Sequence, residues 1–105
     1  MQIGFANPAS ARIFNELEQM RRAFGPELAY KIANRLALLS AAGNLAQVPT
    51  SLPIGCRPLD AGGTRFAVTI TSTRRLAFRA LDGVSGRGGS LEKITAIEVR
   101  GVEDC

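Results

Sequence analysis

The feature that most constrains the fold is a run of alternating apolar and polar side chains between Arg65 and Leu81. Side chains in a strand alternate with a period of two, so this run predicts two strands that each have one apolar face. The apolar positions are Phe66, Val68, Ile70, Leu76, Phe78 and Ala80. A hairpin that keeps both apolar faces together gathers Arg65, Arg75 and Arg79 on the opposite surface.

The loop between these two strands decides their register. A two-residue loop would place apolar residues opposite polar ones and mix the two faces. We therefore predict a three-residue loop over 72–74, which sets Ile70 opposite Leu76 and Val68 opposite Phe78.

Two amphipathic helices are predicted in the first half of the chain. The first begins with Asn7 as N-cap and Pro8 at its first position, and it runs to about Phe24. The second covers 26–42, so a very short joint makes the pair an antiparallel hairpin. Their apolar stripes have helical spacing and are Ile13, Leu17, Met20 and Phe24 in the first helix, and Leu28, Ile32, Leu36 and Leu39 in the second.

Three further strands complete the predicted sheet. A short strand covers 2–6, a weak one with an internal proline covers 55–60, and the last covers about 94–102. Gly101 is expected to mark a bulge in the last strand. The glycine-rich segment 82–89 is interpreted as a connector, because it has no Lys-Ser/Thr ending of a phosphate loop.

The predicted fold is therefore one α+β domain over residues 1–105. Its N-terminal strand and helical hairpin pack on one face of a mostly antiparallel, twisted sheet. An apolar content of 46% is enough for one packed core.

Composition excludes several kinds of site. The chain has no histidine, which excludes a histidine-based triad and a histidine-containing zinc site, and we expect no metal and no cofactor. Its two cysteines, Cys56 and Cys105, are expected to be unpaired, with Cys56 buried, as in a reduced cytoplasmic protein. We identify no signal peptide and no membrane helix. Arginine makes up 11 of the 13 basic residues, a bias that favours binding of phosphate or carboxylate.

Four segments together resemble the motifs of one known family. Residues 11–49 look like its helical hairpin, and GCRPLD (55–60) looks like its Cys-His-x-Leu strand. RRLAFRA (74–80) looks like its Tyr-Arg-Leu-x-Phe strand, and ITAIEVRGVEDC (94–105) like its closing strand, which ends Asp-Tyr-His. On these motifs the chain resembles the RelE/ParE superfamily of bacterial toxins, most closely the HigB-like plasmid maintenance killer branch.

The resemblance implies a RelE-like fold and a function. Family members are toxins of type II toxin–antitoxin systems and act in the cytoplasm as mRNA interferases, typically on ribosome-bound message. A cognate antitoxin, expected here to be a helix-turn-helix DNA-binding protein, holds the toxin inactive. The toxin itself is not expected to bind DNA. The implied reaction is attack of an RNA 2′-hydroxyl on the adjacent phosphate, which needs charge stabilisation and proton transfer.

The resemblance also suggests residue roles. Arg75 matches the arginine of the Arg-Leu-x-Phe motif, Arg57 stands where the family has histidine, and Cys105 stands where it has tyrosine. The candidate catalytic residues are therefore Arg57, Arg75 and Cys105, and the candidate RNA-phosphate ligands are Arg65, Arg75 and Arg79. The family's terminal histidine would fall past Cys105, so no proton-transfer group is evident, since arginine stays protonated.

Whether the protein is an enzyme stays open at this point, because three alternatives remain. The chain could be a catalytically weak or inactive relative that binds antitoxin or RNA. It could be a ParE-like inhibitor that binds an enzyme target. Finally, the three arginines could pair internally with Glu98, Glu103 or Asp104, in which case the patch is structural.

Overall fold

The computed structural model of the chain describes residues 1–81 and 91–105. Its elements are β1 (Gln2–Phe5), α1 (Pro8–Asn15), α2 (Leu17–Phe24), α3 (Pro26–Ala41), a 3-10 turn η1 (Leu45–Gln47), β2 (Arg57–Pro58), β3 (Arg65–Thr69), β4 (Arg74–Ala80) and β5 (Ala96–Asp104). The strands form a five-stranded sheet in the order β1-β5-β4-β3-β2. The β1–β5 pair is parallel and the other pairs are antiparallel, so the predicted α+β class and mostly antiparallel sheet are confirmed. The predicted connector 82–89 lies outside the described residues.

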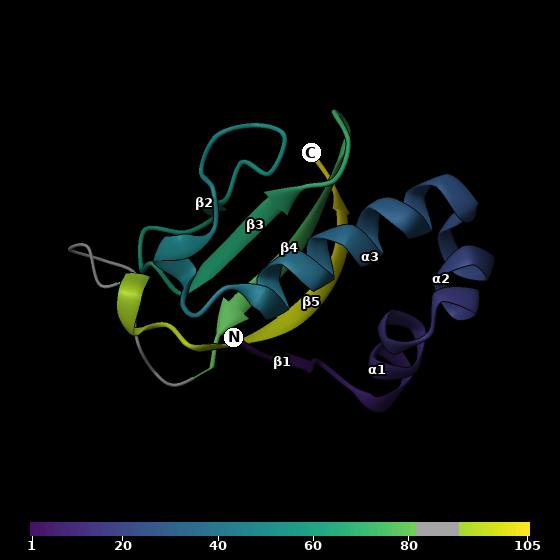
Figure 1. The fold of residues 1–105 in the computed structure, drawn as a ribbon, viewed down its shortest axis with the longest axis horizontal. Coiled ribbons are helices and arrows are strands. Elements are labelled where there is room, and N and C mark those ends of the chain that lie inside the picture. The colour runs from purple at the N-terminus through teal and green to yellow at the C-terminus, as the bar shows by residue number, and fades with distance from the viewer. Residues whose placement is uncertain (82–90) are drawn as a thin grey trace.

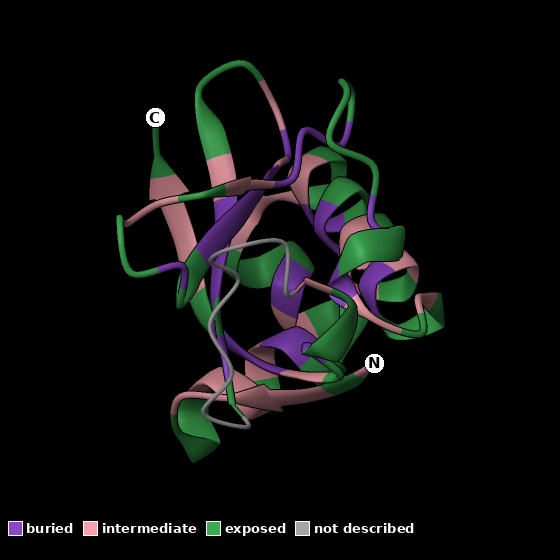
Figure 2. Ribbon diagram, turned by 90° about the vertical axis from the view of Figure 1, so that its left-hand side faces the viewer, coloured by how far each residue is buried: buried purple, intermediate pink, exposed green. Residues whose placement is uncertain are grey.

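The helices and the sheet form two layers around one core. Helix α3 crosses one face of the sheet in front of β4 and β5, whereas α1 and α2 lie beside one end of it (Figure 1). Buried positions lie on the strands and on the helices that face them (Figure 2). The largest fully buried side chains are Phe78, Ile32, Leu39, Leu45, Leu76, Ile94, Ile97, Val68 and Val99. Among the described residues, no helix is both long enough and apolar enough to cross a bilayer.

The first predicted helix is two helices in the structure. Glu16 has an extended backbone (φ −123°, ψ 117°) and separates α1 from α2. The break lets Phe14 stack between Phe5 and Phe24, at ring-centroid distances of 5.9 and 6.1 Å. As a result Phe14 is buried and Leu17 is 38% exposed. The prediction of one continuous stripe through Leu17 is therefore wrong, because aromatic packing against β1 overrides the helical periodicity.

The register of the β3–β4 hairpin differs from the prediction by two residues. Val68 lies opposite Leu76 and Phe66 lies opposite Phe78, where the two rings stack at 6.1 Å. The loop has three residues, as predicted, but it covers 71–73. A shift of two residues leaves every side chain on its own face, so alternation alone does not distinguish the two registers.

Two strands also differ in extent from their predictions. The predicted strand over 55–60 is reduced to the two residues of β2, which lies at an edge of the sheet, where a proline is tolerated. Strand β5 is displaced by two residues toward the C-terminus from the predicted 94–102. This displacement carries Glu103 and Asp104 into the sheet, where they lie beside β4.

Candidate functional site

The candidate site is the face of the sheet opposite the core, which we call the outer face. Its side chains form three rows across β3, β4 and β5, namely Arg65–Arg79–Glu98, Ala67–Ala77–Gly101 and Thr69–Arg75–Glu103. Arg65, Arg75 and Arg79 therefore share one face, as the alternation predicted. The middle row has only small residues, so Arg65 of the first row can reach Glu103 of the third row across it.

A bulge in β5 is what places both glutamates on this face. Phe78 pairs with Val99 and Ala77 pairs with Gly101, so Arg100 is the extra residue of the strand. Gly101 has φ 147°, a conformation that residues with a Cβ rarely adopt. The bulge predicted at Gly101 is confirmed, and it reverses the alternation beyond Arg100.

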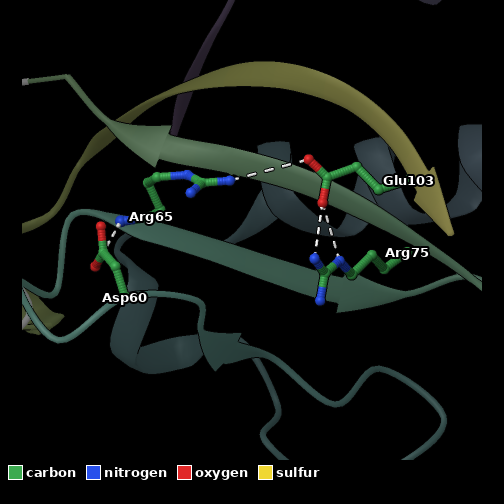
Figure 3. Close-up of polar contacts among 4 residues, drawn as sticks. All are labelled: Asp60, Arg65, Arg75 and Glu103. Carbon is green, nitrogen blue, oxygen red and sulfur yellow. Dashed lines mark hydrogen bonds and ion pairs between the residues drawn. The ribbon is translucent and has the colours of Figure 1, made fainter. Parts of the chain in front are cut away.

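Glu103 lies between two arginines from different strands (Figure 3). Its Oε1 accepts hydrogen bonds from Nε and Nη2 of Arg75 at 3.0 and 2.9 Å. Its Oε2 lies 4.0 Å from Nη2 of Arg65, whose side chain reaches across β4. Each carboxylate oxygen of Glu103 thus faces a different guanidinium.

Glu98 forms a second cluster of the same composition. It pairs with Nη2 of Arg79 at 2.5 Å and with Nη1 of Arg100 at 3.4 Å. Its side chain is only 11% exposed, whereas that of Glu103 is 35% exposed. The two clusters offset the repulsion between Arg65 and Arg79, which lie directly opposite each other in the hairpin.

These pairs correct the prediction of an unengaged arginine patch. Arg65, Arg75 and Arg79 each have Glu98 or Glu103 as a carboxylate partner, as the alternative of a structural patch predicts. The carboxylates do not neutralise the arginines fully. Four guanidinium groups pair with the two carboxylates of Glu98 and Glu103, so the two clusters keep a net charge of +2. An open hollow of about 460 Å³ on this face is lined by Arg65, Arg79, Arg100 and Glu103.

The other two candidate catalytic residues lie at the border of the outer face. Nη1 of Arg57 donates to the carbonyl of Gly55 at 3.0 Å and to Oγ1 of Thr69 at 3.1 Å. Thr69 lies directly opposite Arg75, so Arg57 and Arg75 flank the same threonine. Cys105 is exposed at the chain end, and its contacts are with the β3–β4 loop: its N–H donates to Thr73 and its thiol lies 3.9 Å from the carbonyl of Ser72.

Two contributors to the outer face were missed at the level of sequence. Arg100 joins the arginines of the outer face because it is the extra residue of the bulge. The sequence Arg100-Gly101 does not by itself indicate which of the two residues is the extra one. Asp60 orders the turn into β3, because its Oδ1 accepts from the N–H groups of Thr64 and Arg65 at 3.1 and 3.4 Å and its Oδ2 accepts from the Thr64 hydroxyl at 2.9 Å. An aspartate four residues before a threonine, with two glycines between them, was a signal for such a turn.

No protein-family model matches the chain, and comparisons with curated proteins and with solved structures give no match either. The resemblance to the RelE/ParE superfamily therefore stays a prediction from the sequence motifs. The roles of Arg57, Arg65, Arg75, Arg79 and Cys105 in binding or catalysis stay predictions with it.

Proposed function

We propose that this chain is a RelE-like toxin of a type II toxin–antitoxin system, an mRNA interferase that works in the cytoplasm and is neutralised by a cognate antitoxin. The observation that carries the proposal is the division of the sheet into two faces. One face packs against α3 and the core, and the other gathers four arginines, among them Arg75 of the family motif, with positive charge in excess. A rigid sheet with surplus guanidinium groups suits the RNA backbone.

In this proposal the arginines act by stabilising charge. Attack of the 2′-hydroxyl makes the phosphate more negative, and preorganised guanidinium groups stabilise that charge in the transition state. Arg75 is the best placed, because it is the least exposed of the outer-face arginines and matches the arginine of the family motif. Arginine does not accept the hydroxyl proton, so cleavage is expected to be slow compared with an enzyme that has a histidine base.

The second candidate is a family member that binds RNA or antitoxin without cleaving RNA. Two observations favour it: the chain has no histidine, and Arg57, which stands in the family's histidine position, is held by Gly55 and Thr69. Both candidates use the same face, and they differ only in whether bonds in the RNA are broken.

An RNA cleavage assay with and without ribosomes separates the two candidates. The wild-type protein is compared with Arg75→Ala and with Arg12→Ala, a control at an exposed position of α1 that changes the net charge equally. The interferase predicts cleavage that falls at least tenfold in Arg75→Ala and is unchanged in Arg12→Ala, since the lost contact is made mainly in the transition state. RNA binding without cleavage by verified full-length protein would instead support the binding module. If the protein neither binds nor cleaves RNA, the interferase and the RNA-binding form of the second candidate are both rejected, and antitoxin binding is its one remaining form.

A further inference from the structure

The two glutamates of the outer face differ in a way that bears on how a phosphate would enter. Glu98 lies within β5, is 11% exposed and contacts Arg79 directly across the strand pair. Glu103 is next to the last residue of β5, is 35% exposed and touches the hollow. Glu103 can therefore leave its partners by turning toward solvent, whereas Glu98 has no comparable exit.

The position of Glu103 is that of a bridging anion. One of its oxygens receives two donors of Arg75, and the other faces Arg65 at 4.0 Å, the longest of the outer-face ion pairs. A phosphodiester has two non-bridging oxygens, and arginine binds phosphate and carboxylate through the same paired N–H groups. An RNA phosphate would thus fit the same two arginines with one oxygen directed to each.

We propose that Glu103 is a built-in competitor for the phosphate site. An RNA phosphodiester displaces its carboxylate from Arg65 and Arg75, while Glu98 stays in place and keeps Arg79 and Arg100 oriented. This inference rests on the proposed function, because it takes RNA as the source of the phosphodiester. In this inference the internal ion pair lowers the affinity of Arg65 and Arg75 for RNA phosphate, because the phosphate has to displace the Glu103 carboxylate.

The chain offers a matched control for this idea. Asp104 follows Glu103 directly and pairs with Arg74 at 3.1 Å, outside the two arginine–glutamate clusters. Glu103→Gln and Asp104→Asn each remove one negative charge from neighbouring positions, so they change long-range attraction for RNA alike. Only Glu103→Gln removes the negative charge that pairs with Arg65 and Arg75. Glu103→Asp is a second variant, which keeps the charge but draws the carboxylate back by one methylene.

The test is fluorescence anisotropy with a labelled single-stranded RNA oligonucleotide at low salt, after circular dichroism has shown that each variant is folded. We expect Glu103→Gln to bind roughly fivefold more tightly than Asp104→Asn, as removal of a competing ion pair predicts. Glu103→Asp is expected to bind more tightly than wild type despite its unchanged charge. Equal affinities of Glu103→Gln and Asp104→Asn, with wild type binding RNA, would overturn the inference alone.

Two other outcomes separate this inference from the proposed function. If neither the wild type nor any variant binds the oligonucleotide, the RNA-binding function and the inference both fail. A second outcome is that Glu103→Gln raises the affinity for a DNA oligonucleotide of the same sequence as much as it raises the affinity for RNA. In that case displacement of Glu103 by a phosphodiester is supported, but specificity for an RNA phosphodiester is rejected. Tighter RNA binding without any cleavage supports the inference and rejects only the interferase.

Discussion

Glu98 and Glu103 are five residues apart in one strand and nevertheless face the same side of the sheet. A regular strand would direct them to opposite faces, because an odd separation reverses the side. The extra residue Arg100 and the unusual backbone of Gly101 restore the match. The bulge thereby supplies Arg75 and Arg79 with carboxylate partners and keeps Glu103 out of the core.

Gly101→Ala tests this dependence on the bulge. At Gly101 a Cβ would meet no atom within 4 Å, so its cost comes from the backbone conformation at φ 147° and not from a clash. We expect the free energy of unfolding to fall by about 1–3 kcal/mol, measured by urea denaturation. Gly62→Ala is the control, since its Cβ would meet only a side-chain oxygen of Asp60 at 4.0 Å. Equal losses in both variants would contradict the role of the bulge.

In β3 and β4, patterns with a period of two predicted which face each residue occupies, but they did not predict the pairing partners. Val68 and Phe78 keep their predicted face in either register, so the sequence determines the side and the stacking of Phe66 on Phe78 favours the register. The position of Arg65, Arg75 and Arg79 on one face depends only on the alternation of side chains, and it was predicted correctly. Glu98 and Glu103 were among the possible partners named from the sequence, but which arginine each one faces depends on the register of β5 and its bulge.

Helical periodicity was less informative near the N-terminus. The stripe of the first predicted helix matched the ideal spacing, and no glycine or proline lies at Glu16 to indicate the break. The break follows from a contact between Phe14 and Phe5, a residue in the preceding strand. Such tertiary contacts override local propensity and are not visible in a single helix pattern.

Substitutions in α1 and α2 distinguish two helices from one. We expect Phe14→Ala to lower the free energy of unfolding by about 3–5 kcal/mol, because the ring is buried between two other aromatic rings. Leu17→Ala is expected to cost less than about 1 kcal/mol, because Leu17 is exposed. Urea denaturation of both variants provides the measurement. A larger loss in Leu17→Ala would instead support one continuous helix.

The two cysteines are expected to differ in reactivity. Burial raises the pKa of Cys56 to about 11, and the nearby charge of Arg57 opposes this only in part. The thiolate is the reactive form, so at pH 8 a disulfide reagent should modify only the exposed Cys105 in the folded protein. The second thiol should react after denaturation, and Cys105→Ser should abolish the fast phase. Rapid reaction of two thiols in the native wild type would contradict the buried position.

Asp60 is expected to contribute to acid sensitivity. Desolvation acts to raise its pKa, but hydrogen bonds from the Thr64 hydroxyl and from the N–H groups of Thr64, Arg65 and Gly63 outweigh it, and the pKa is lowered. A lowered pKa in the folded state means that the contribution to stability is present above the unfolded value, roughly pH 4, and is lost as the pH falls further.

Asp60→Asn therefore provides a pH-dependent comparison. The difference in unfolding free energy between wild type and Asp60→Asn should be largest at neutral pH and should shrink below about pH 4, as followed by urea titrations at several pH values. Thr64→Val removes one hydrogen bond to the carboxylate and should reduce the pH-dependent part of that difference. A difference that does not change with pH would show that the Asp60 carboxylate is not stabilised by the turn.

The proposed antitoxin gives the last prediction, and it follows from the surplus charge of the outer face. An antitoxin segment with several carboxylates would bind Arg65, Arg79 and Arg100, which are each about half exposed. Co-expression with the neighbouring gene should yield a complex that dissociates as salt rises from about 0.1 M to 1 M, where the Debye length shortens from about 10 to 3 Å. Arg79→Ala should lower the salt concentration at which the complex dissociates, whereas Arg12→Ala on α1 should leave it unchanged. Repeated recovery of the chain alone, at low salt and from its own operon, would contradict the proposal that an antitoxin covers this face.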